Sequence, residues 1–227
     1  MIRWLLLPVA ALLLAVSAAA KDSADWKLVS DRDGIQIYMA HSDDSRIKTF
    51  RGVTTFELDD FYAIGALLED QEYFPRWLYL IRDLHEVRRR STTDRDFYVL
   101  TKLPWPVADR DAGLNFLVRQ DPQTHEVQIN FRAREGIVKD EKKFVRIPEM
   151  YGHFNTLPVG GKKVRVTFEV RLDPGGYIPA FLANFILKDI PFVSLQRVRR
   201  IINTDRFKGH VVDYIKPPEP WVAAQAP

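Results

Sequence analysis

Apolar and polar side chains alternate along most of the chain. The alternation is cleanest over residues 126–134 and 163–172, where one face of each run carries Val, Ile, Phe, Leu and Ala. Period-two alternation is typical of an antiparallel β-sheet with one dry face and one wet face. The same pattern, bounded by turn residues, predicts further strands over residues 34–38, 48–56, 84–90, 96–102, 112–119, 142–147 and 151–157.

In three segments the apolar residues recur every three or four positions, which predicts helices. The apolar pattern over 58–68 predicts an amphipathic helix that begins near Asp59-Asp60, and a second, short helix is expected over 73–80. A third helical pattern follows the turn at 173–176 and runs over 179–206, where Pro191 should kink the helix or divide it in two. The apolar stripe of this last helix is predicted to cover the dry face of the sheet.

The two ends of the chain differ from its middle. Residues 1–20 join a short basic start, an apolar run and the small residues Ser17-Ala18-Ala19-Ala20, a pattern typical of a cleaved export signal. An uncleaved anchor is the alternative, but the apolar run falls short of the ~20 residues that span a bilayer. We predict a signal peptide over 1–20, a folded domain over 21–216 and a flexible tail over 217–227. The protein should be exported, and periplasmic if its host has two membranes.

The composition narrows the class of protein. The chain has 227 residues, of which 46% are hydrophobic and 28% charged, and it contains no Cys. These values exclude a disordered or disulfide-stapled chain. Its 33 basic and 30 acidic residues are interspersed, so the net charge of +3 creates no strong field for nucleic acid. We therefore expect one globular domain, monomeric and without a nucleic-acid partner.

Motifs that carry enzyme chemistry are not found. The sequence has no Gly-x-Ser-x-Gly elbow, no Gly-x-Gly-x-x-Gly fingerprint and no nucleotide-binding Gly-rich loop. Its five His residues are scattered singly, without a second ligand at metal-binding spacing. The sequence thus predicts no catalytic residue, no metal site and no cofactor. The basic cluster Arg197/Arg199/Arg200 is interpreted as a solvated face, with anionic membrane head groups as the alternative partner.

Several segments resemble motifs of one protein family. Residues 103–111, Leu-Pro-Trp-Pro-Val-Ala-Asp-Arg-Asp, resemble the Pro-Trp-Pro-x-x-x-Arg-Asp segment of START domains, the StAR-related lipid-transfer family. Residues 173–184 resemble the Asp-x-Gly-Gly-x-Ile-Pro-x-x-x-x-Asn segment that leads into the closing helix of that family. The opening over 26–38 and Phe50-Arg51-Gly52 fit its first hairpin. These segments occur in the family's order and together span nearly the whole chain after residue 20.

The resemblance implies an α+β helix-grip fold, in which a curved antiparallel sheet wraps around a long C-terminal helix and leaves an internal apolar cavity. It also implies lipid binding or lipid transfer. One hydrophobic ligand, such as a phospholipid or a sterol-like lipid, would lie in a tunnel gated by the C-terminal helix, and the protein would contact membrane surfaces transiently. The alternative is an enzyme of the cyclase or hydrolase type that acts on a hydrophobic molecule in the same cavity, which would require an acid/base pair there.

Residues expected to line the cavity follow from this resemblance and from the predicted strand faces. Phe116 stands where the sterol-binding members resemble one another in having an Arg, which indicates a more apolar cavity or polar recognition by Tyr98, Asn115 or Asn130 instead. Arg110 and Asp111 match the family motif and are predicted to form a structural ion pair. The expected ligand-binding residues are Trp77, Tyr98, Leu100, Leu114, Phe116, Phe131, Phe168, Phe181 and Phe185.

Overall fold

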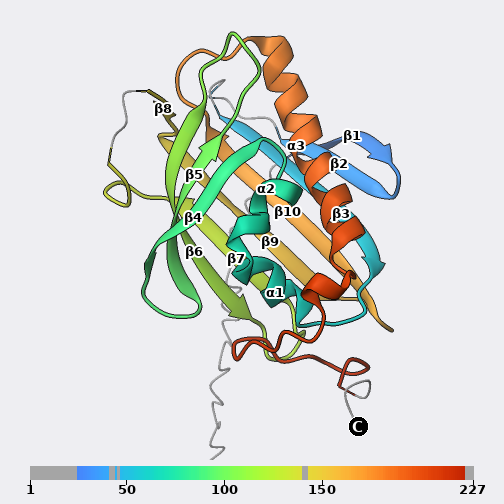
Figure 1. Cartoon of the computed structure of the whole chain (residues 1–227). Coiled ribbons are helices and arrows are strands. Elements are labelled where there is room, and N and C mark those ends of the chain that lie inside the picture. The colour runs from blue at the N-terminus through green and yellow to red at the C-terminus, as the bar shows by residue number, and fades with distance from the viewer. Residues whose placement is uncertain (1–24, 41–43, 45–46, 140–142, 223–227) are drawn as a thin grey trace, which may run out of the picture.

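One large β-sheet forms the body of the protein. The computed structural model describes residues 25–40, 44, 47–139 and 143–222, and within them ten strands join in the order β1-β2-β3-β10-β9-β7-β6-β5-β4, with the short β8 beside β6. Neighbours pair antiparallel, except that β8 pairs parallel with β6. The sheet curves but does not close, so β1 and β4 are its edges (Figure 1). The strands are β1 (Trp26–Arg32), β2 (Ile35–Ala40), β3 (Lys48–Glu57), β4 (Ile81–Arg89), β5 (Asp94–Thr101), β6 (Arg110–Gln120), β7 (Val127–Ala133), β8 (Val145–Arg146), β9 (Glu149–Pro158) and β10 (Lys163–Asp173).

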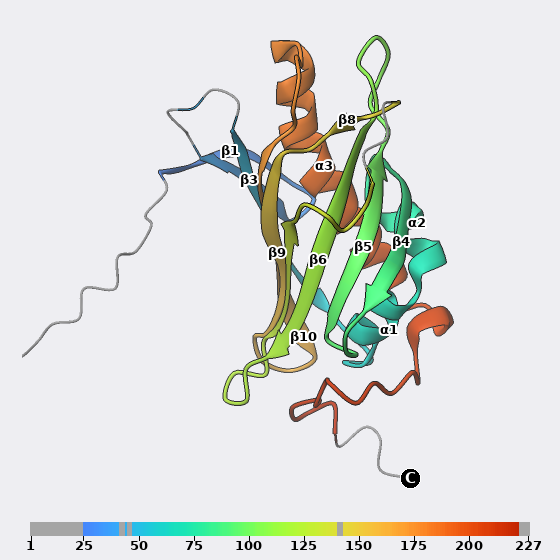
Figure 2. The same ribbon diagram turned by 90° about the vertical axis from the view of Figure 1, so that its left-hand side faces the viewer.

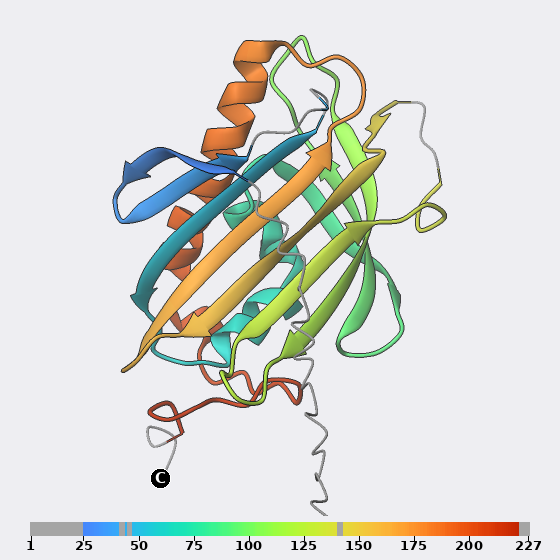
Figure 3. The ribbon, with the colours of Figure 1, turned by 180° about the vertical axis from the view of Figure 1, so that it is seen from behind.

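The described helices lie on the concave side of this sheet. The long helix α3 (Ala180–Ile201) contacts β2, β3 and β10, whereas α1 (Ala63–Glu69), the 3-10 turn η1 (Gln71–Tyr73) and α2 (Phe74–Trp77) cover the half towards β4. A second 3-10 turn, η2 (Asp205–Phe207), follows α3. Figure 2 shows the layers from the side, and Figure 3 shows the opposite face of the sheet, over which no described helix lies. None of the described helices is both long and apolar enough to cross a bilayer.

Strand alternation explains how the sheet forms its dry face. In β10, the inward side chains run from Val164 to Leu172 at every second residue, and Phe168 pairs with Phe154 of β9 and Gly52 of β3. Directly paired residues of antiparallel strands point to the same face, so apolar rows align across the sheet. The predicted strands over 126–134 and 163–172, and the predicted helix-grip fold, are confirmed.

Gly52 lets α3 approach the sheet closely. A Cβ atom at this position would lie 2.7 Å from Leu195 Cδ1 and 3.1 Å from Pro191 Cβ, both on α3. Any larger residue would therefore push the helix away from β3. Of the two alternatives for Pro191, a kink or a division of the last helix, the division is wrong, because α3 continues through Pro191 to Ile201. It ends earlier than the predicted 206, since the chain turns into η2.

The first helix also begins later than predicted. We expected it to begin near Asp59-Asp60, but α1 begins at Ala63. Asp60 Oδ1 accepts a hydrogen bond from the Tyr62 amide at 2.9 Å, and this local turn competes with helix before Ala63. Leu58 and Phe61 are nonetheless fully buried, so their apolar spacing reflected burial rather than helix.

The C-terminal segment is docked further than the sequence indicated. A flexible tail was expected from Pro217, yet the Trp221 side chain is 2% exposed. Its Nε1 donates a hydrogen bond to the Leu58 carbonyl at 2.7 Å, and its ring lies 5.1 Å from that of Phe61. The buried indole explains why this part of the predicted tail is held. Residues 223–227, like the predicted signal peptide over 1–20, lie outside the described residues.

Candidate functional site

A cavity of about 170 Å³ lies between the concave face of the sheet and the helices. Its wall is built from strands on both sides and from apolar residues of α1, α2 and α3, including Leu67, Trp77 and Ile186. The volume is roughly ten times the room that one water molecule needs. The cavity therefore exceeds the ordinary packing gaps of a protein interior.

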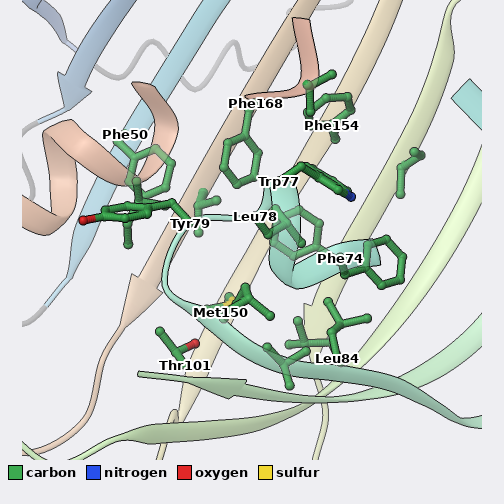
Figure 4. A pocket seen from close by; sticks show the side chains of 18 of the residues that line it. Phe50, Phe74, Trp77, Leu78, Tyr79, Leu84, Thr101, Met150, Phe154 and Phe168 are labelled. Carbon is green, nitrogen blue, oxygen red and sulfur yellow. The ribbon is translucent and has the colours of Figure 1, made fainter. Parts of the chain in front are cut away.

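Aromatic rings form one side of this cavity (Figure 4). The rings of Phe74 and Trp77 lie 5.8 Å apart, and Trp77 lies 5.9 Å from Phe154 on β9. Phe168 on β10 continues the series at 5.9 Å from Phe154 and 5.7 Å from Phe50 on β3. This row joins α2 to three strands, so it couples the position of α2 to the sheet.

Few polar groups reach the cavity. Among the described lining residues these are Lys48, Tyr79, Thr101, Arg110 and Thr156, together with the Trp77 indole, and none is Asp, Glu or His. The Trp77 Nε1 is buried and has no hydrogen-bond partner among the described residues. The acid/base pair that the enzyme alternative requires is thus not found among the described lining residues. Nor does any group of three or more His, Asp or Glu there form a candidate metal site.

Five of the predicted ligand-binding residues line the cavity. They are Trp77 on α2, Leu114 and Phe116 on β6, Phe131 on β7 and Phe168 on β10. Phe116 lies 5.7 Å from Phe131 between ring centroids, so these two rings extend the aromatic wall across adjacent strands. Period-two alternation, together with the family resemblance, identified the inward faces of these three strands.

Tyr98 and Leu100 do not line the cavity, and their assignment was wrong by one residue. Leu114 pairs with Phe97, and Tyr98 pairs with Gly113, so the even-numbered residues of β5 face the other side of the sheet. A shift of one residue exchanges the two faces of a strand. Val99 and Thr101 occupy the inward positions instead, and Tyr98 lies 5.3 Å from the outer His85 ring.

The amides proposed for polar recognition also face outward. Asn115 donates hydrogen bonds to Asp94 and Asp96 on the outer side of β5, at 2.7 and 3.1 Å. Asn130 pairs with His153 on the same outer face. Neither lines the cavity, because both stand out of phase with the inward residues Phe116 and Phe131 of their own strands.

On α3, the two predicted Phe residues have different outcomes. Phe185 is 37% exposed, does not line the cavity and has its ring 6.4 Å from that of Tyr79. Its neighbours Ala183 and Ile186 line the cavity instead, because a helix turns each successive residue by about 100°. The Phe181 side chain lies outside the described part of the structure.

Arg110 and Asp111 do not pair with each other as predicted. They are consecutive on β6 and point to opposite faces, so Asp111 pairs on the outer side with Arg146 at 2.8 Å. Arg110 points inward, is 3% exposed and lines the cavity. Burial lowers the pKa of its guanidinium, although Arg stays charged in proteins.

Some lining residues were not predicted. Phe50 and Phe56 on β3 lie at alternate positions of a recognised strand, so the same alternation that placed Phe168 could have found them. Phe74 could not be assigned in this way, because α2 spans only four residues and shows no full apolar period. Its position depends on packing against β5, where its ring lies 6.2 Å from Phe97.

Comparison with known proteins identifies this arrangement. The chain matches no protein-family model. It is 30% identical over 175 residues to the uncharacterized protein PA1579 of Pseudomonas aeruginosa, which covers 77% of this chain and 85% of that protein. It is 25% identical to the mouse phosphatidylcholine transfer protein, over 75% of this chain and 80% of that one.

A solved structure matches over nearly the whole of its length. The STAR-related lipid transfer protein of Xanthomonas axonopodis superposes with a TM-score of 0.70 at 26% identity, covering 79% of this chain and 99% of that chain. This match shows that the open antiparallel sheet and the long C-terminal helix of the chain follow a known architecture. The chain belongs to the StAR-related lipid-transfer (START) domain family.

Proposed function

We propose that the protein binds one lipid in its interior cavity and carries it between membrane surfaces. The apolar cavity carries this proposal. Leaving a cavity of about 170 Å³ empty costs about 4 kcal/mol at the ~24 cal/mol per Å³ found for buried voids. Water gains little there, since the wall offers few hydrogen-bonding groups. An apolar occupant restores the lost contacts, and the likeness to a phosphatidylcholine transfer protein supports a lipid.

Native mass spectrometry of the purified protein, followed by solvent extraction, tests the binding. We expect one lipid per chain. Leu114→Trp should strongly reduce this occupancy, because the larger ring enters the cavity. Phe185→Asp is the matched control on the outside and should keep the lipid. A wild-type protein that is empty and takes up no fluorescent lipid from vesicles would contradict the proposal.

Membrane contact is proposed for the loops at the end where α3 begins. Trp105 in the β5–β6 loop is 92% exposed, and Tyr177 just before α3 is 83% exposed. Arg110 Nη2 donates to the Tyr177 carbonyl at 3.4 Å, which joins the two loops. Trp and Tyr favour the interface between lipid and water. Trp105→Ala should slow lipid transfer between vesicles and leave lipid occupancy unchanged; an unchanged rate would exclude this contact.

Export is proposed from residues 1–20, which carry the pattern of a cleaved signal. N-terminal sequencing of the protein from its own host should find Lys21 as the first residue. A chain that retains residues 1–20 in the membrane fraction would instead support the anchor alternative.

A further inference from the structure

The charged groups on the cavity wall are all basic among the described lining residues. They are Lys48 and Arg110. Lys48 begins β3, where it pairs with Leu172 near the end of β10, and Arg110 begins β6. Both therefore lie at the end of the sheet from which the chain passes into α3. This end of an otherwise apolar cavity thus carries both cationic side chains of the described lining residues.

Arg110 is the more deeply buried of the two cations, and its acceptors are all neutral. Its Nη1 donates to the Ala108 carbonyl, its Nε to the Pro174 carbonyl at 3.4 Å, and its Nη2 to Gly175 and Tyr177 carbonyls at 3.1 and 3.4 Å. Within the described part of the chain, no carboxylate lies within 4.0 Å of the guanidinium. A buried charge is costly unless an opposite charge compensates it.

The nearby carboxylates are engaged elsewhere. Asp109 Oδ1 accepts a hydrogen bond from the Leu103 amide at 3.1 Å, and its Oδ2 lies 3.8 Å from Arg82. Asp111 points to the outer face and binds Arg146. Asp109 therefore raises the pKa of Arg110 only through space, without a hydrogen bond or ion pair, and burial, which lowers this pKa, is the larger effect.

The start of α3 adds to the positive potential at this end. Its first turn contains no acidic residue, and its N-cap, Pro179, supplies no side-chain hydrogen bond. A helix N-terminus carries a partial positive charge that favours anions. Ile178, just before this turn, lines the cavity, so the helix end lies beside it.

We infer that this end of the cavity receives the anionic head group of an acyl lipid, a carboxylate or a phosphate, and that Arg110 is its charge partner. The inference rests on the proposed lipid-binding function and adds the chemical class of the ligand. The acyl chain would extend from this end along the aromatic wall of Trp77 and Phe168. Guanidinium pairs with carboxylate and phosphate through strong, charge-assisted hydrogen bonds.

Paired probes test this inference on the delipidated full-length protein. Dibromostearic acid and its methyl ester share one acyl chain and differ in charge, and bromine quenches the fluorescence of the lining Trp77. At pH ~8, where the acid is ionised, we expect it to bind about ten-fold more tightly than the ester, the equivalent of one charge-assisted contact. A brominated phosphatidic acid and the matching diacylglycerol form the second pair and identify a phosphate ligand. Preference for the charged member of either pair supports the inference.

Variants assign the preference to one side chain. Arg110→Gln should bring the affinity ratio to about one while the ester still binds, because only the charge partner is lost. Arg110→Lys keeps the charge and should keep a preference. Lys102→Gln removes an exposed positive charge near the same end and is the matched control, for which the wild-type ratio is expected.

The outcomes separate this inference from the proposed function. Equal binding of both members of each pair by the wild-type protein overturns the anionic site but leaves lipid binding intact. An unchanged ratio in Arg110→Gln also overturns it. If Arg110→Gln also stops binding the ester, Arg110 is needed to hold the 174–177 loop. In that case the acid-to-ester affinity ratios of the wild-type protein and of Arg110→Lys test the anionic site. Failure of the wild-type protein to bind any probe contradicts the proposed function itself.

Discussion

Trp221 anchors the C-terminal segment through a single side chain. Its indole is 2% exposed, contacts Phe61 and donates a hydrogen bond to the Leu58 carbonyl. Trp221→Ala should lower the free energy of unfolding by about 3–5 kcal/mol, because it empties a buried site. Trp221→Phe keeps a ring but loses the hydrogen bond, which contributes about 1 kcal/mol.

Urea denaturation measures both effects, and Trp105 supplies the control. Its side chain is 92% exposed, so Trp105→Ala should change the free energy of unfolding by less than about 0.5 kcal/mol. Equal stability of Trp221→Ala and the wild-type protein would show that the segment after residue 216 is not docked on the domain.

Asp96 links stability to pH through its buried carboxylate. Arg90 donates hydrogen bonds to both of its oxygens, at 2.7 and 2.6 Å, and Asn115 adds another at 3.1 Å. The Arg90 hydrogen bonds hold the pKa of Asp96 below its ordinary value. Its stabilising effect is therefore fully present above the unfolded pKa of about 4, and is lost as the pH falls through the lower folded pKa.

Asp96→Asn should accordingly lower stability at neutral pH and make the loss of stability below pH ~4 shallower than in the wild-type protein. Urea midpoints over a pH series measure both changes. Asp213→Asn, at an exposed position, should leave the dependence of the urea midpoint on pH unchanged. Parallel curves for Asp96→Asn and wild type in acid would exclude Asp96 as a contributor.

Individual strands were well predicted, whereas their mutual register was not. Alternation placed Phe131 and Phe168 on the inward face because each strand contains enough alternating positions to define its own faces. Tyr98 was misplaced because β5 is apolar on both faces, with Phe97, Val99 and Leu100 all buried. Only the pairing of Leu114 with Phe97 resolves the ambiguity, and that pairing depends on the turn and on tertiary contacts.

The position of Arg110 on the cavity wall was not predicted, for a related reason. Arg110 and Asp111 are adjacent in sequence, and adjacent opposite charges suggest a pair. A strand places them on opposite faces, however, so Asp111 meets Arg146 from β8 and Arg110 enters the cavity. The short β8 strand brings Arg146 to this position, and nothing in the local sequence of β6 specifies it.

The contact between β3 and α3 sets the distance from helix to sheet. Gly52 leaves room for Leu195 and Pro191, and a Cβ atom there would already be within 3.1 Å of both. Gly52→Val should lower the free energy of unfolding by about 1–3 kcal/mol, because the helix must shift or the side chains must leave their rotamers. Thr55→Val on the exposed side of β3 is the control in urea denaturation. If Gly52→Val left the free energy of unfolding unchanged, α3 would not be packed tightly against β3.

The whole molecule consists of an open sheet with a helix across its concave face (Figure 1). The cavity is lined by residues of both. Because the sheet is not closed, the wall formed by α3 can move without breaking the pairing of central strands. A ligand enclosed in this way leaves only when part of the wall opens. We propose that α3 is the moving part, since it contacts the sheet through side chains rather than through backbone hydrogen bonds.

A cross-link between α3 and β3 tests this movement. A Cβ atom at residue 52 would lie 3.1 Å from Pro191 Cβ, which is shorter than the ~3.5–4.5 Å of disulfides, so α3 must shift slightly outward to accommodate the bridge; the chain has no other Cys. Oxidised Gly52→Cys/Pro191→Cys should keep its bound lipid but transfer it between vesicles at least about ten-fold more slowly, and reduction should restore the rate of the same sample. The reduced protein is thus its own control for the substitutions. Equal transfer rates in the oxidised and reduced states would place the exit at another part of the cavity wall.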